Sequence, residues 1–135
     1  MNLYGFEMDE TISPFECNMG WTVCWQDDQR DFFGKESLIK QKESNDLKEL
    51  VGIITDEKAI LRQGQKIHLE EENHARGVVT SGTYSPSLRK PIALARLPKS
   101  ESTSCFAEIR GKRVKAIIGS PKFIKEGKLI FKEKV

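Results

Sequence analysis

The sequence predicts a mainly β protein: a small antiparallel six-stranded β-barrel, preceded by an extended segment, a short strand and a short helix. Two observations lead to this fold class. After residue 46, six short apolar or alternating runs follow one another at regular spacing, with turn-forming residues between them. Before residue 46 that spacing is absent. A series of short antiparallel strands is typical of a barrel or sandwich, which covers the strand edges that an open sheet would expose.

The beginning of the chain has a distinct composition. Residues 2–11 mix aromatic side chains with carboxylates and show no clear period, which favours an extended segment packed over another domain. Residues 21–25 are rich in β-prone side chains and follow a glycine, so they predict a short strand. In such a strand Trp21 and Trp25 would face the same side, because side chains alternate with a period of two.

A short amphipathic helix is predicted at residues 35–42, with Leu38 and Ile39 directed inward and the lysines outward. The polar residues 43–46 then predict a linker, after which the strand pattern begins.

The barrel strands are predicted at residues 50–54, 66–69, 77–82, 92–96, 105–109 and 114–118. Between the last two, Gly111 supplies the positive φ of a tight hairpin. Residues 80–88 are dense in hydroxyl and turn-forming side chains, and we interpret them as an ordered loop held by side chain-to-backbone hydrogen bonds. Loops of that kind often carry binding residues.

Composition limits the class of protein. Hydrophobic residues make up 38% and charged residues 31%, as in a soluble globular domain. No apolar run approaches the roughly 20 residues that a membrane span needs, and no signal peptide is visible at the N-terminus. Cys17, Cys24 and Cys105 include no CxxC pair, so we expect reduced thiols in a cytoplasmic protein.

Positive charge gathers near the end of the chain, although the net charge is only +2. We expect a solvated strand face with a frayed tail, and we keep open that this end recruits an anionic partner. The cations concerned are Arg110, Lys112, Arg113, Lys115, Lys122, Lys125, Lys128, Lys132 and Lys134.

The residues by themselves indicate no active site. His68 and His74 lack the further donors that a metal site needs, so we interpret them as surface or strand histidines. Glu7, Asp9 and Glu10 lie in a polar segment predicted to be exposed, where capping a helix or pairing with a neighbouring domain is favoured over acid-base catalysis. No nucleotide-binding glycine fingerprint is present.

Several segments together resemble the glycine-cleavage T-protein family. The first block holds Leu-Tyr-Gly at residues 3–5, and another holds Thr-Ser-Gly-Thr-Tyr-Ser-Pro-Ser-Leu at residues 80–88. The blocks follow the order of the family at similar spacing and cover nearly the whole chain: residues 1–11 with Pro14, 19–22, 31–35, 79–88, 92–95, 108–112 and 121–123.

The resemblance implies a fold and an activity. Members of the family move the aminomethyl group of a lipoylated H-protein to tetrahydrofolate, forming methylenetetrahydrofolate, ammonia and the dihydrolipoyl arm. Their three domains surround a folate channel, and the last domain is a β-barrel. Residues 1–45 are then expected to be a remnant of the preceding folate-binding domain with its connecting helix, and residues 46–135 the C-terminal barrel.

The same resemblance implies what this sequence lacks. The catalytic Asp, the pterin-holding Glu and an Arg of the family precede the Leu-Tyr-Gly block, so no catalytic residue and no metal ligand is expected here. The chain alone is expected to be inactive, to bind tetrahydrofolate only weakly and to need the N-terminal half of the T-protein as a partner.

Three residues are the expected folate contacts. Trp21 aligns with a channel-lining Trp of the family, Lys128 lies where the tail approaches the glutamate carboxylates of folate, and Tyr4 follows the missing Arg. Partners are expected to include lipoylated H-protein but neither nucleic acid nor membrane. Two alternatives stay open: a stand-alone β-barrel that binds another molecule, and the C-terminal part of a related folate-dependent demethylase.

Overall fold

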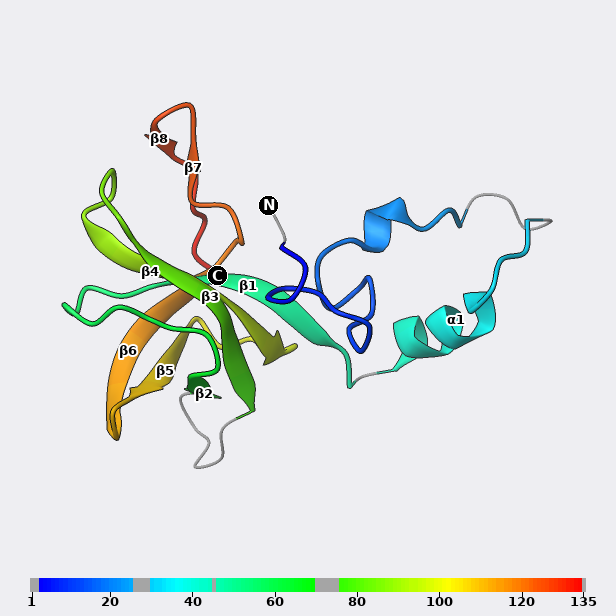
Figure 1. The fold of residues 1–135 in the computed structure, drawn as a ribbon, viewed down its shortest axis with the longest axis horizontal. Coiled ribbons are helices and arrows are strands. Elements are labelled where there is room, and N and C mark those ends of the chain that lie inside the picture. Colours follow the sequence, from blue (N-terminus) through cyan, green and yellow to red (C-terminus); the bar gives the residue numbers. More distant parts are fainter. Residues whose placement is uncertain (1–2, 26–29, 45, 70–75, 135) are drawn as a thin grey trace.

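The predicted six-stranded antiparallel barrel is confirmed by the computed structural model, which describes residues 3–25, 30–44, 46–69 and 76–134. All neighbouring strands are antiparallel, and the sheet closes on itself (Figure 1). In order around the barrel the strands are β1 (Lys48–Ile54), β4 (Lys90–Pro98), β3 (Gly77–Ser85), β2 (Lys66–Leu69), β5 (Ser104–Ile109) and β6 (Lys112–Gly119).

The barrel interior is filled by branched and small side chains. Ile53, Ile67, Val79 and Ala95 are completely buried, and each lies on a different strand. Leu61, from the connection between β1 and β2, is also completely buried in this core. A closed barrel of this size has room for side chains only, so any binding site must lie on its outside or at its ends.

The strands β3 and β4 are longer than predicted. Strand β3 continues to Ser85, beyond its predicted end at Gly82, and β4 begins at Lys90, so residues 83–85 belong to a strand rather than to the loop predicted for residues 80–88. The turn preference of residues 83–85 is overridden because each of them pairs with a residue of β4.

The hairpin between β5 and β6 is as predicted. Ile109 pairs with Lys112, which leaves a two-residue turn of Arg110 and Gly111. Both turn residues have positive φ, 50° and 75°, which matches the twist of the flanking strands.

The short strand predicted at residues 21–25 is wrong, because the chain forms a 3-10 helix at Gly20–Thr22 (η1). The amide and hydroxyl of Thr22 both donate to the Met19 carbonyl, a local alternative to pairing with a strand. The two tryptophans consequently have different surroundings. Trp21 is 80% exposed, whereas Trp25 stacks on Phe15 with 5.9 Å between ring centroids.

Helix α1 (Lys35–Glu43) covers the predicted residues, but its predicted inward face is wrong. No residue of α1 is buried: Leu38 is half-buried and Ile39 is 39% exposed. The helix lies apart from the barrel, so its apolar side chains have no core to enter (Figure 1).

The C-terminal tail returns to the barrel, and so the frayed tail expected there is not found in the described residues. A small hairpin of β7 (Ile124–Lys125) and β8 (Lys128–Leu129) follows the barrel. The Phe123 and Phe131 rings stack at its base, and the Lys134 amide donates to the Ile118 carbonyl of β6 at 2.9 Å. Among the described residues, no helix is long and apolar enough to cross a membrane.

Candidate functional site

A buried carboxylate joins the N-terminal segment to the barrel. Glu7 is only 2% exposed, and its Oε1 atom accepts hydrogen bonds from Thr80 Oγ1 at 3.0 Å and Ser81 Oγ at 2.5 Å. Its Oε2 atom accepts the Leu3 amide at 3.0 Å, and the Glu7 amide donates in return to the Leu3 carbonyl at 3.1 Å. Because both carboxylate oxygens are occupied by donors, Glu7 is arranged as an anchor and not as an acid-base group.

A β-bulge in β3 explains how two consecutive hydroxyls reach one oxygen. In a regular strand, side chains 80 and 81 would point to opposite faces. The register with β4 shifts here, because Val79 pairs with Ala95 while Ser81 pairs with Leu94. Thr80 is therefore the extra residue, and the bulge turns both hydroxyls toward Glu7.

Arg96 provides a second anchor on the outer face of β4. Its Nη2 atom donates to the Glu7 carbonyl at 2.6 Å, and its Nε atom to the Glu16 carbonyl at 3.4 Å. The side chain is nearly buried, with 8% of the residue exposed, because residues 7–16 cover it. A guanidinium has five donors in a fixed plane, so it can hold two separate carbonyls of one segment in place.

The three N-terminal carboxylates, all predicted to be exposed, differ in their burial and in their hydrogen-bond partners. Glu7 pairs with the barrel, whereas Asp9 is exposed and accepts the hydroxyl and amide of Thr11 at 2.6 and 2.8 Å. These two hydrogen bonds lower the pKa of Asp9, because they favour its ionised form. Glu10 is exposed.

A shallow hollow of 230 Å³ lies beside this anchor. Its walls come from β3, β4 and the ring of Phe123. Ser81 lines the hollow and also donates to Glu7, so the anchor shapes one wall of the hollow.

The predicted folate contacts Trp21, Tyr4 and Lys128 are all exposed, and the structure does not bring them into contact. Tyr4 is 68% exposed in a tight loop that Gly5 closes by donating to the Met8 carbonyl at 2.8 Å. Lys128 is exposed on β8, at the end of a hairpin that projects away from η1 (Figure 1). Within the described residues, no hydrogen bond, ion pair or ring contact links any two of these three side chains.

No metal centre is found in the described part of the chain, since no three His, Cys, Asp or Glu side chains converge there. His68 lies on β2 with its Nε2 atom 3.4 Å from Glu108 Oε2, as expected for a strand histidine. His74 lies outside the described residues. Burial raises the pKa of the Cys17 thiol, which disfavours the reactive thiolate.

The anchor around Glu7 was missed at the sequence level because its members are 73 to 89 residues apart. Two signals were present nonetheless. The hydroxyl pair of Thr80 and Ser81 directly follows two valines of the predicted strand, and Arg96 directly follows the apolar run of residues 92–95. A polar side chain beside a barrel core needs a partner, and that partner is the N-terminal segment.

The comparisons with known proteins agree on one family. Residues 48–125 match the family model described as glycine cleavage T-protein C-terminal barrel domain. The chain is 43% identical over 125 residues to an aminomethyltransferase of Methylococcus capsulatus, covering 93% of this chain and 34% of that protein. It is 43% identical over 128 residues to an aminomethyltransferase of Legionella pneumophila, covering 95% and 35%.

A solved structure resembles the fold over nearly the same span. The crystal structure of glycine cleavage system aminomethyltransferase T from Bartonella henselae matches with a TM-score of 0.78 at 28% identity. The match covers 98% of this chain and 37% of that one. The chain therefore spans about a third of the length of the curated relatives it matches.

Proposed function

The chain belongs to the glycine cleavage T-protein family, and from this premise we propose that it is the C-terminal part of a tetrahydrofolate-dependent aminomethyltransferase. The whole protein would transfer the aminomethyl group of a lipoylated H-protein to tetrahydrofolate and release ammonia and the dihydrolipoyl arm. The observation that carries the proposal is the 43% identity to named aminomethyltransferases, which extends over 93% of the chain and so includes the N-terminal segment as well as the barrel.

Residues 46–135 are proposed to be the C-terminal barrel domain, and residues 1–45 to belong with a preceding folate-binding domain. Support comes from the unusual exposure of large apolar side chains in the N-terminal segment. Leu3, Tyr4, Phe6, Trp21 and Phe33 are each at least 42% exposed. Such a concentration of apolar surface typically marks an interface, and we assign it to the N-terminal half of the T-protein.

The anchor around Glu7 fits this division. It holds the segment that carries the apolar side chains against the outer face of β3 and β4. The barrel would thereby present Tyr4 and Trp21 to the preceding domains in a defined position.

The folate contacts remain proposals for Trp21, Tyr4 and Lys128. Trp21 is supported by its exposure, since no described aromatic ring stacks on it whereas Trp25 is already stacked on Phe15. Lys128 makes no ion pair with a described residue, so its ammonium is available to the carboxylates of a glutamate tail. We further propose the cytoplasm as the compartment, where the three free cysteines would stay reduced.

A chimera tests the proposal. The C-terminal third of the Methylococcus capsulatus aminomethyltransferase is replaced by this chain, and aminomethyl transfer is measured with lipoylated H-protein and tetrahydrofolate. We expect turnover by the chimera and none by the 135-residue chain alone. A folded chimera without turnover would overturn the proposal, and so would turnover by the chain alone.

Single substitutions in the chimera test the folate contact. Trp21→Ala is expected to raise KM for tetrahydrofolate about tenfold, because an aromatic stacking contact contributes on the order of 1–1.5 kcal/mol. Trp25→Ala, whose ring stacks on Phe15, serves as the matched control and should leave this KM within about twofold. Equal effects of the two substitutions would exclude a specific contact by Trp21.

A further inference from the structure

A groove with a positively charged rim lies at one end of the barrel. It has a volume of 580 Å³ and runs between the connection of β1 to β2 and the hairpin of β5 and β6. We call it the cationic groove, and its walls consist of Glu57, Lys58, Ala59, Ile60, Arg62, Gln65, Ile109, Arg110, Lys112 and Val114. The turn between β5 and β6 lies on the opposite side of the barrel from α1 and η1, so a partner covering the N-terminal segment would leave the groove open (Figure 1).

The charges of the cationic groove are unbalanced. Among the described residues, its rim carries four cationic side chains, those of Lys58, Arg62, Arg110 and Lys112, and one carboxylate, that of Glu57. All four cations are exposed, and none forms an ion pair with a described residue. Like charges held together on one rim repel each other, and an anionic ligand relieves that repulsion.

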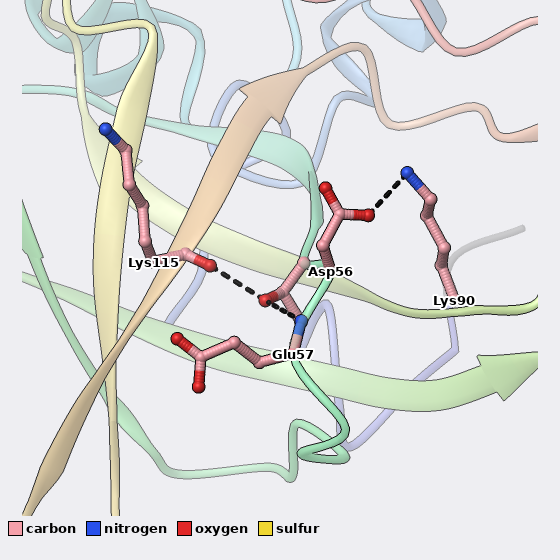
Figure 2. A network of polar contacts seen from close by, with 5 residues as sticks. Asp56, Glu57, Lys90 and Lys115 are labelled. Atoms are coloured by element: carbon pink, nitrogen blue, oxygen red, sulfur yellow. Dashed lines mark hydrogen bonds and ion pairs between the residues drawn. The ribbon is translucent and has the colours of Figure 1, made fainter.

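Polar contacts at the start of the connection between β1 and β2 hold one wall of the groove in place. The Thr55 hydroxyl donates to the Lys115 carbonyl at 2.8 Å and accepts the Glu57 amide at 3.2 Å (Figure 2). The neighbouring carboxylate of Asp56 is paired with Lys90 at 2.5 Å. Asp56 is thus already paired with a cation of β4, and it is not among the residues of the groove wall.

The floor of the cationic groove is aliphatic. Val114 is buried and Ile109 packs against the barrel core, while Ile60 is 41% exposed at the rim. None of the described residues that form the groove wall is aromatic. Nucleic-acid bases are usually bound by stacking on aromatic rings, so this combination favours a protein segment with carboxylates and an aliphatic side chain.

We propose that the cationic groove docks a carboxylate-rich protein segment. Its acidic side chains pair with Arg62 and Arg110, and an aliphatic side chain between them lies against Ile60. This inference does not depend on the aminomethyltransferase assignment, because it rests on the groove alone.

Fluorescence anisotropy of the full 135-residue chain tests the proposal, with a labelled peptide of repeated Glu-Glu-Leu as the probe. We expect binding that weakens at least tenfold between about 0.1 M and about 1 M salt, since the Debye length falls from roughly 10 to roughly 3 Å. The double variant Arg62→Glu with Arg110→Glu should lose at least tenfold in affinity at the lower salt. Ile60→Ser should weaken binding severalfold at both salt concentrations.

The matched control places the same change of charge elsewhere. Lys122→Glu with Lys125→Glu alters two exposed lysines before and within β7 and should leave the affinity within about threefold. Circular dichroism confirms that each variant is folded. Equal losses of affinity in the two double variants would show that only the net charge of the chain matters, and would overturn the proposal. Tighter binding of a labelled oligothymidine, lost in the groove variant, would overturn it in favour of a nucleic-acid site.

Discussion

The substitution Glu7→Ala tests whether the buried carboxylate holds the N-terminal segment on the barrel. It removes the acceptor of three hydrogen bonds, from Leu3, Thr80 and Ser81. A hydrogen bond to a charged group contributes about 1.5–3 kcal/mol. The loss is less than the sum, because the Thr80 hydroxyl keeps the Leu94 carbonyl as an acceptor at 3.2 Å.

Two further effects reduce the loss. Ser81 is half-exposed and Leu3 is exposed, so water can replace the carboxylate at both donors. Removal of the buried charge also ends its own desolvation penalty. We therefore expect the docked segment to lose about 2–3 kcal/mol, which corresponds to about a 30- to 150-fold change in an opening equilibrium.

Amide hydrogen exchange measures this opening directly. The amides of Glu16 and Met19 donate to the carbonyls of Ser13 and Pro14, and their protection should fall by this factor in Glu7→Ala. The strands of the barrel should change much less, because Glu7 is not part of the core cluster. Asp9→Ala is the control, since the Asp9 carboxylate accepts its described hydrogen bonds from the nearby Thr11 and none from the barrel. Unchanged protection in Glu7→Ala, or an equal loss in Asp9→Ala, would refute the reasoning.

Three other outcomes are expected. Gly82→Ala should lower the free energy of unfolding by about 1–3 kcal/mol in urea titration, because the new Cβ would lie 2.3 Å from the Leu61 carbonyl oxygen. Thr83→Ala, at the exposed neighbouring residue, should lower this free energy much less. Equal losses in the two variants would contradict the contact. In the native protein a thiol reagent should modify the exposed Cys24 before the buried Cys17, and equal rates followed by mass spectrometry would contradict the burial. Because the pKa of the Cys17 thiol is raised in the folded state, the unfolded chain loses this proton first as the pH rises. The free energy of unfolding should therefore fall above about pH 8.5, which a lower urea midpoint would show. This fall should vanish in Cys17→Ala.

Local patterns were sufficient for much of the barrel. Strand β2 has the predicted bounds, and β5 and β6 extend the predicted ranges by only one to three residues. The turn between β5 and β6 followed from Gly111, because a two-residue hairpin needs positive φ. These features depend on residues close together in the chain, where alternation and turn chemistry act directly.

The errors share one cause. Residues 21–25 contain β-prone side chains but form no ladder with another strand, so hydrogen bonding within the segment produced η1 instead. Conversely, residues 83–85, which belong to a turn-rich run, are held as a strand because β4 pairs with them. In both places the presence or absence of a distant partner outweighed the local preference.

The proposed sites also differ in whether the sequence indicated them. Exposure of Trp21, Tyr4 and Lys128 is compatible with the contacts that the family resemblance implies, and those contacts await the chimera experiment. The anchor of Glu7 and the cationic groove, by contrast, were not predicted as sites. Each joins side chains from distant parts of the chain through the bulge of β3 or the closure of the barrel.

The sequence by itself therefore determined the family and the six barrel strands, because family blocks and strand periodicity are linear properties of the chain. Only the tertiary structure decided which polar side chains meet. The carboxylate of Glu7 reaches Thr80 and Ser81 because the bulge turns two successive side chains to one face. Arg96 is covered because the segment held there spans the outer face of β4, a contact that no local pattern records.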